Sequence, residues 1–167
     1  PNAESYERLY PVEVIKQEFR CDASGAGKFR GGSGIVYEAY FEEPVEYSFR
    51  AEGLARDTGK GVLGGYDGKK GRVKLSFKGK DTKDILPPDY GLMRVKPGKL
   101  KIVSPAGGGF GDPLERDHNL VLRDVKDEII SINFAKEHYG VVFNENAIKV
   151  DIIETNKLRK IKKRKQN

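Results

Sequence analysis

Few side chains in this sequence have the chemistry of a catalytic or metal-binding centre. The chain contains two histidines, His118 and His138, and one cysteine, Cys21. A metal site needs several His, Cys, Asp or Glu ligands that converge on one point, and a nucleophilic triad needs a base beside a Ser or Cys. The histidines fall on separate predicted helices, and no spaced carboxylate pair indicates an acid and a base. We therefore predict no metal site, and the sequence assigns no catalytic residue.

The densest pattern is residues 104–116, which read SPAGGGFGDPLER. Glycine allows backbone conformations that other residues avoid, so the first half is unsuited to helix or strand. The second half predicts a helix start, because Asp112 suits the N-cap, Pro113 the first helical position and Glu115 a capping box. The glycine-rich part that leads into this start comprises Gly107, Gly108, Gly109, Phe110 and Gly111.

Two interpretations of this junction between loop and helix compete. Backbone N–H groups at a helix N-terminus can bind an anion or a phosphate. Alternatively, the glycines let the backbone pack closely against another surface, while Asp112 satisfies the helix end. The second interpretation is favoured, because the Asp112 carboxylate occupies the anion position and repels a second negative charge.

Two earlier stretches are also rich in glycine. In residues 22–34, Lys28 and Arg30 flank Phe29; these cations could meet an anion, but we expect a glycine-rich loop with a packed aromatic ring. Residues 59–64 read GKGVLG, which are the letters of a dinucleotide-binding fingerprint. The following GYDGKKG cannot open the helix on which a pyrophosphate would sit, so we reject this motif.

The charge of the chain is concentrated at its C-terminus. The net charge is +6, but residues 157–167 hold seven Lys or Arg and no acidic residue, so the rest is close to neutral. We predict one domain over residues 1–156 and a basic tail over 157–167, solvated and disordered or a frayed helix. No apolar run is long enough for a membrane helix, and the lone cysteine and the lack of a signal pattern at the start suit the cytoplasm.

Alternating and β-branched segments predict an α+β fold, mainly an antiparallel β-sheet or sandwich with a small C-terminal helical cap. The short connection at 42–44 predicts a hairpin, and Pro97-Gly98 predicts a turn. Helical periodicity follows Arg116, a second helix is expected from Ser131 to Gly140, and 147–153 is a last strand or a helix start. The expected strands are 12–20, 35–41, 45–51, 72–79, 91–95 and 99–103, with a break at Pro87-Pro88.

These motifs together resemble the C-terminal segment of B-type subunits in the hydantoinase B/oxoprolinase family. The resemblance rests on SPAGGGFGDPLERD at 104–117, VLRDV at 121–125 and YGVV at 139–142. Residues 22–32 are similar to the family segment DSGGAGRYRGG, and GVLGG at 61–65 to its GLFGG loop. The resemblance covers roughly residues 1–145, so the chain is expected to begin inside what is normally a larger subunit.

The resemblance implies a component of an ATP-dependent cyclic-amide hydrolase of the hydantoinase or 5-oxoprolinase type. The implied partners are an ATP-binding A-type subunit and the remainder of the B-type subunit. ATP and a divalent metal are then expected elsewhere in the complex, with no cofactor bound by this chain. The residues expected at a subunit interface or at the edge of an active-site cavity are Gly107, Gly108, Gly109, Phe110, Gly111, Asp112, Lys28, Arg30, Gly64 and Gly65.

Three alternatives stay open at this point. The chain could belong to an ATP-dependent ketone carboxylase, or it could be an interaction module without catalysis. It could also bind nucleic acid through the tail, in which case binding would weaken steeply with salt and vanish when residues 157–167 are removed. No residue of the sequence indicates whether the substrate is a hydantoin, 5-oxoproline, another lactam or a ketone.

Overall fold

The computed structural model describes residues 2–50, 53–54, 58–77, 83–85, 90–144 and 149–166. The chain forms two compact units. Unit 1 comprises Pro1–Glu18, Gly34–Thr58 and Lys70–Pro105, and unit 2 comprises Phe19–Ser33, Gly59–Lys69 and Ala106–Asn167. The expected single domain over residues 1–156 stays a prediction. The expectations for Ala51, for 78–79, for Pro87-Pro88 and for 147–148 fall outside the described residues.

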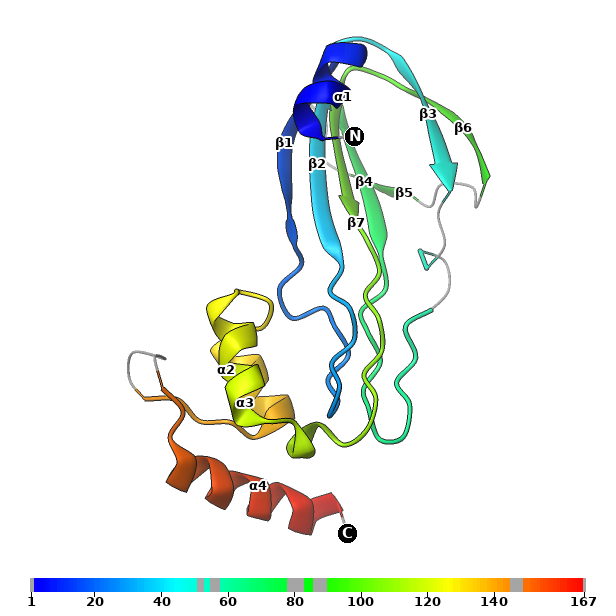
Figure 1. The fold of residues 1–167 in the computed structure, drawn as a ribbon. Coiled ribbons are helices and arrows are strands. Elements are labelled where there is room, and N and C mark those ends of the chain that lie inside the picture. The colour runs from blue at the N-terminus through cyan, green and yellow to red at the C-terminus, as the bar shows by residue number, and fades with distance from the viewer. Residues whose placement is uncertain are drawn as a thin grey trace. The chain divides into compact units, whose positions relative to one another are not determined.

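Unit 1 consists of two β-sheets and one short helix, α1 (Figure 1). The larger sheet has the strand order β1-β2-β7-β4-β5, and the smaller sheet pairs β3 with β6. Every strand pair whose register is described is antiparallel, which confirms the predicted fold class. The bounds are α1 Ala3–Leu9, β1 Val12–Phe19, β2 Ile35–Phe41, β3 Val45–Arg50, β4 Arg72–Phe77, β5 Lys83–Ile85, β6 Tyr90–Val95 and β7 Gly98–Val103.

The core of unit 1 is formed by the apolar residues of strands in which apolar and polar residues alternate. Leu100 of β7 is fully buried, and Val73 of β4 is almost so. Val95 contributes from β6, so the smaller sheet shares this core with the larger one. The buried cluster comprises Val12, Ala39, Phe41, Val73, Leu75, Val95 and Leu100.

The predicted hairpin between residues 35–41 and 45–51 is wrong. Strand β2 lies between β1 and β7, so both of its backbone edges are occupied. Strand β3 instead pairs with β6, with Val45 opposite Val95. Because each edge of a strand can form only one ladder, residues 42–44 connect two sheets rather than two neighbouring strands.

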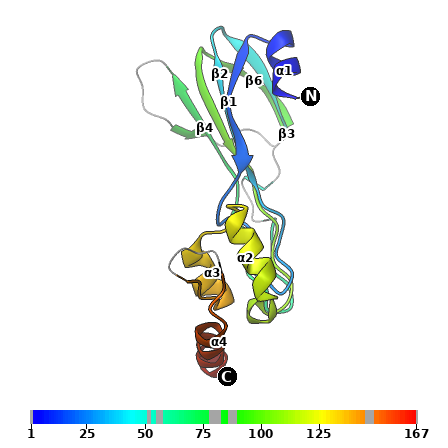
Figure 2. The same cartoon turned by 60° about the vertical axis from the view of Figure 1, so that its left-hand side comes forward.

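Unit 2 combines glycine-rich segments with helical elements (Figures 1 and 2). The predicted caps are confirmed: Asp112 and Ser131 accept hydrogen bonds from the first turns that follow them, and Gly140 ends a helix with φ of 61°. Asp117 likewise caps the helix after it. The bounds are the 3-10 helix η1 Pro113–Glu115, and the helices α2 His118–Lys126, α3 Ile132–Tyr139 and α4 Ile152–Gln166.

Of the two forms expected for the basic residues near the C-terminus, a disordered tail or a helix, the described residues up to Gln166 form a helix, which begins earlier, at Ile152. Arg159 of α4 donates through Nε to the Tyr139 carbonyl oxygen at 2.9 Å and through Nη2 to the Arg116 carbonyl oxygen at 2.8 Å. Lys162 Nζ donates to the Glu137 carbonyl oxygen at 2.8 Å. Helix α4 is therefore bonded to the rest of unit 2.

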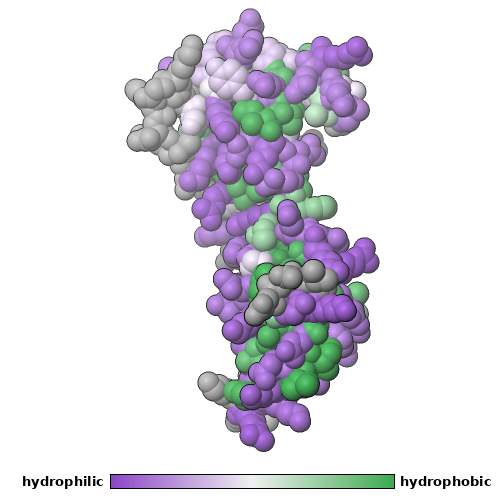
Figure 3. Space-filling model, turned by 90° about the vertical axis from the view of Figure 1, so that its left-hand side faces the viewer, coloured by the Kyte–Doolittle hydropathy of each residue, from purple (hydrophilic) through white to green (hydrophobic). Residues whose placement is uncertain are grey.

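The surface is mainly polar on the face drawn in Figure 3, where hydrophilic residues surround smaller groups of hydrophobic ones. None of the helices in the described ranges combines the length and the apolar character that crossing a bilayer requires.

Glu38 gives a test of the larger sheet. Its carboxylate, on β2, lies 2.6 Å from Lys101 Nζ and 2.8 Å from Lys99 Nζ, both on β7. Hydrogen bonds from Lys101 and Lys99 lower the pKa of Glu38 from 4.5 to about 2. A carboxyl group whose pKa is lower in the folded state stabilises the fold above its unfolded pKa, and this stabilisation is lost as the pH falls through the folded pKa. We expect Glu38→Gln to lower the free energy of unfolding by about 1 kcal/mol at pH 7.

The difference between wild type and Glu38→Gln should shrink as the pH falls from 4.5 toward about 2. The matched control is Glu46→Gln, because Glu46 pairs with Arg94 across β3 and β6 at 2.9 Å while both side chains are more than half exposed. Such exposed pairs add little stability. Urea unfolding across this pH range measures both variants. A difference that does not change with pH, or an equal loss in the control, would contradict the role of Glu38.

Candidate functional site

Backbone hydrogen bonds gather the glycine-rich stretches of unit 2 into one structure, which we call the glycine bundle: residues 22–33, 59–69 and 106–111. Figures 1 and 2 show these segments side by side as long loops. The central segment, 106–111, bonds to both of the others. Its bonds include Gly25 N–H to Gly107 O, Gly107 N–H to Gly32 O, Val62 N–H to Gly109 O and Gly109 N–H to Tyr66 O, all at 2.8 or 2.9 Å.

The bundle is packed so closely that several of its glycines have no space for a Cβ atom. A Cβ atom added at Gly107 would lie 3.0 Å from Gly32 N. One added at Gly108 would meet the Lys60 carbonyl oxygen, and one added at Gly109 would meet the Ala26 carbonyl oxygen. Residues 107 and 109 therefore face the stretch 22–33, and residue 108 faces the stretch 59–69. A side chain would therefore clash at residues 108 and 109, and residue 107 has little space for one.

Gly64 and Gly65 complete a tight turn in the second stretch. The Gly65 N–H donates to the Val62 carbonyl oxygen at 3.0 Å, and φ is 50° at Leu63 and 91° at Gly64. Two successive positive φ angles are typical of a type I′ turn. A Cβ atom at Gly65 would meet the Gly109 carbonyl oxygen, so this glycine holds the turn against the central segment.

The junction of loop and helix is satisfied by the protein's own groups. Asp112 Oδ1 accepts a hydrogen bond from the Leu114 N–H at 2.8 Å. Lys28 Nζ lies 3.3 Å from Glu115 Oε2, so this cation is paired within the unit. The interpretation in which Asp112 satisfies the helix end is confirmed, and the helical element that it starts is the single turn η1.

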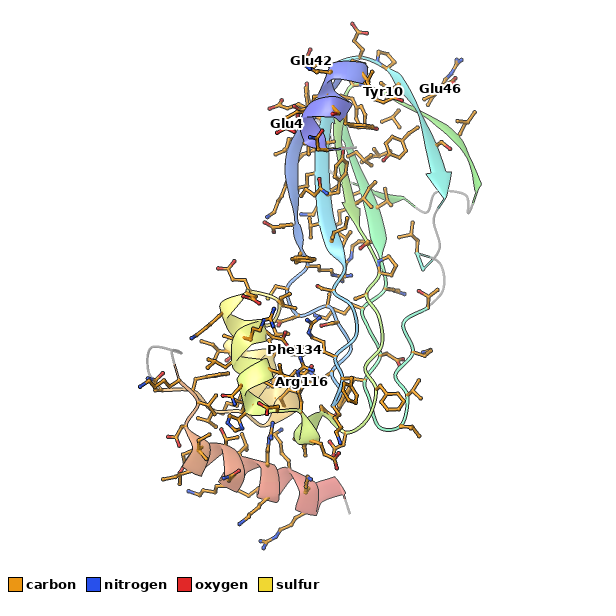
Figure 4. The ribbon with its side chains drawn as sticks, in the orientation of Figure 1. Glu4, Tyr10, Glu42, Glu46, Arg116 and Phe134 are labelled. Atoms are coloured by element: carbon orange, nitrogen blue, oxygen red, sulfur yellow. The ribbon has the colours of Figure 1, made fainter. Side chains whose placement is uncertain are left out.

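Arg30 belongs to an ionic cluster with Arg116 and Asp124 (Arg116 is labelled in Figure 4). Arg30 Nε and Arg116 Nη2 donate to the same oxygen, Asp124 Oδ2, at 3.2 and 2.8 Å. Arg116 Nη1 also donates to the Lys28 carbonyl oxygen at 3.2 Å. The Asp124 and Arg116 side chains are only 7% and 9% exposed, so removal of Asp124 would leave the buried Arg116 charge without its counter-ion. The cluster thereby fastens the glycine bundle to α2.

Sequence reasoning missed this cluster. One signal was present, because Asp124 lies three residues after Val121 and therefore shares its helical face. Val121 is fully buried. A carboxylate on a buried helical face requires a cationic partner, but the pattern of α2 does not say which arginine supplies it.

Two aromatic rings of the bundle, Phe29 and Phe110, are largely exposed. Phe29 is 62% exposed and Phe110 is 47% exposed, and their ring centroids lie 6.3 Å apart. The expectation of a packed ring at Phe29 is wrong, because backbone atoms fill the interior of the bundle and leave no space there for a side chain.

The groups that could do chemistry are placed in structural settings. The His138 ring contacts Phe134 and Tyr66, with centroids at 4.1 and 5.1 Å, and burial lowers its pKa. Burial raises the pKa of the Cys21 thiol, which is the opposite of what a reactive thiolate needs. Within the described ranges, no group of three His, Cys, Asp or Glu is placed to hold a metal ion.

Two adjacent glycines test the packing of the bundle. A Cβ atom at Gly31 would meet the Gly107 carbonyl oxygen, whereas one at Gly32 would meet nothing within 4 Å. We expect Gly31→Ala to lower the free energy of unfolding by about 3 kcal/mol, because the backbone has to move apart. Gly32→Ala, the matched control, should change it by less than about 0.5 kcal/mol. Denaturant titration of both variants makes the comparison, and equal stabilities would contradict the close packing.

The chain is similar to known proteins along nearly its whole length. The family model described as hydantoinase B/oxoprolinase matches residues 1–113. The chain is 34% identical over 161 residues to the putative B-type subunit of a D-/L-hydantoinase from a Pseudomonas species, covering 95% of this chain and 26% of that protein.

Two solved structures share this architecture. The ATP-dependent caprolactamase from Pseudomonas jessenii matches with a TM-score of 0.74 and 30% identity, covering 95% of this chain and 28% of that one. Nucleotide-free acetone carboxylase matches with a TM-score of 0.72 and 22% identity, covering 99% of this chain and 26% of that one, which shows a shared fold. The chain thus spans about a quarter of the length of these relatives. It belongs to the hydantoinase B/oxoprolinase family.

Proposed function

We propose that this chain forms the C-terminal part of a hydantoinase B-type subunit in an ATP-dependent cyclic-amide hydrolase. The observation that carries the proposal is the likeness of almost the whole chain to an ATP-dependent caprolactamase. The relative from the D-/L-hydantoinase supports the same reaction class, because a hydantoin and a lactam are both cyclic amides. The substrate of this protein is accordingly a cyclic amide such as a hydantoin, 5-oxoproline or another lactam.

The role proposed for this chain is structural support and contact, with the reaction carried out elsewhere. The glycine bundle and the cluster of Arg30, Arg116 and Asp124 form a stiff scaffold, and their polar groups bond to one another. We assign ATP and a divalent metal to an A-type subunit and to the remainder of the B-type subunit. ATP-dependent chemistry and a single reduced cysteine suit a cytoplasmic enzyme.

A ketone carboxylase is the second candidate, because the fold is shared with acetone carboxylase. At 22% identity that likeness supports the fold alone, whereas the hydantoinase and caprolactamase relatives are 30% identical or more. The hydrolase is therefore the better supported reading.

The test is purification of the native complex through a tag on this chain. We expect an ATP-binding chain to co-purify, and the complex to hydrolyse a hydantoin, 5-oxoproline or caprolactam only when ATP is present. A complex that lacks this region should lose about ten-fold or more of that activity, because the scaffold no longer orients its partners. The Gly32→Ala variant serves as a control that keeps the scaffold intact.

Full activity without this region would contradict the proposal. ATP-dependent incorporation of labelled bicarbonate into a ketone, with no hydrolysis of the three cyclic amides, would favour the carboxylase instead.

A further inference from the structure

Four exposed apolar residues gather on the glycine bundle, and we call them the apolar tip: Phe29, Val62, Leu63 and Phe110. Their exposed fractions are 62%, 51%, 74% and 47%. Isolated β-bridges pair Phe110 with Phe29 and with Val62, so the side chains come from adjacent backbone positions. Leu63 follows Val62 in the tight turn of residues 62–65. A contiguous exposed apolar group of this kind marks a contact surface more often than an isolated leucine does.

The apolar tip is held in place before any partner binds. Phe29 and Phe110 exchange two backbone hydrogen bonds, at 3.0 and 2.9 Å. Val62 donates to the Gly109 carbonyl oxygen and accepts from the Gly111 N–H, both at 2.9 Å. Because the backbone is fixed by these bonds, docking would cost little conformational entropy.

Two lysines near the tip residues in the sequence, Lys28 and Lys60, are each in an ion pair. Lys28 lies 3.3 Å from Glu115, and Lys60 lies 2.8 Å from Asp67. An apolar centre with a polar, neutral rim is the composition of a protein–protein interface. A nucleic acid or an anionic membrane surface would instead require an excess of cations.

We propose that the apolar tip docks onto an apolar surface of the remaining part of the B-type subunit. This inference rests on the proposed function. We favour the rest of the B-type subunit as the partner because the chain spans about a quarter of each relative's length. The other three quarters of each relative offer a surface against which this region can pack. The tip then contributes the anchor residues of that interface, with Leu63 and Phe29 as the most exposed of them.

The test compares two substitutions at leucines of nearly equal exposure. Leu63→Asn removes the apolar side chain at a position with φ of 50°, and asparagine tolerates positive φ better than leucine. The melting temperature of the chain should therefore stay the same or rise. Leu92→Asn is the matched control, because Leu92 on β6 in unit 1 is 70% exposed against 74% for Leu63. Phe29→Ser is a second tip variant.

The probe is the rest of the B-type subunit from the same organism, produced as a separate chain and titrated by calorimetry. We expect wild type and Leu92→Asn to bind it equally, and Leu63→Asn and Phe29→Ser to bind about ten-fold or more weakly. Binding by the tip variants that equals wild type would overturn the docking inference and leave the proposed function standing. The same two tip variants can be titrated against a second copy of this chain and against the A-type subunit. If they lose binding only to one of these probes, and not to the rest of the B-type subunit, the docking inference is also overturned.

If wild type itself does not bind the rest of the B-type subunit, the proposed function fails, and this inference fails with it. The two failures are distinguishable, because failure of the docking inference alone leaves wild-type binding intact, whereas failure of the proposed function already appears in wild type.

Discussion

Unit 2 depends on one constraint: Gly108 and Gly109 of its central segment lie closer to neighbouring backbone segments than a Cβ atom allows. Glycine is needed at 108 and 109 for that reason, although it loses more conformational entropy on folding than other residues do. Hydrogen bonds between backbone groups offset part of this cost, in place of the apolar contacts that hold most cores together. Because the interior is backbone, aromatic rings such as Phe29 and Phe110 point outward.

A bundle with so few side chains inside needs other links to the helices around it. Asp124 supplies one, since it accepts hydrogen bonds from an arginine of the bundle and from Arg116. Arg159 supplies another, because its guanidinium spans two carbonyl oxygens at the ends of different elements. The planar guanidinium has five N–H donors in a fixed arrangement, which allows one side chain to satisfy several acceptors. The C-terminal basic segment thereby has a structural role as part of α4.

The interiors of the two units are built in different ways. Unit 1 buries alternating side chains such as Val73 and Leu100 between two sheets, whereas unit 2 combines backbone packing with an apolar cluster around Tyr139. The described residues of both units hold few reactive groups, and Cys21 of unit 2 is an exposed thiol whose pKa is raised by its partial burial. The chain corresponds to about a quarter of the length of its relatives.

The sequence by itself determined the features that depend on neighbouring residues. Alternation marked the strands, and the caps at Asp112, Ser131 and Gly140 were readable because a cap involves only the next few positions. The glycine runs also showed where backbone had to pack closely. Strand pairing was decided by the tertiary structure, because the partner of β2 depends on which edges are available and not on the short connection that follows it. The tertiary structure also decided that Arg30 pairs with Asp124. These residues lie 94 positions apart in the sequence, and only the folded chain brings such distant charges within hydrogen-bonding distance.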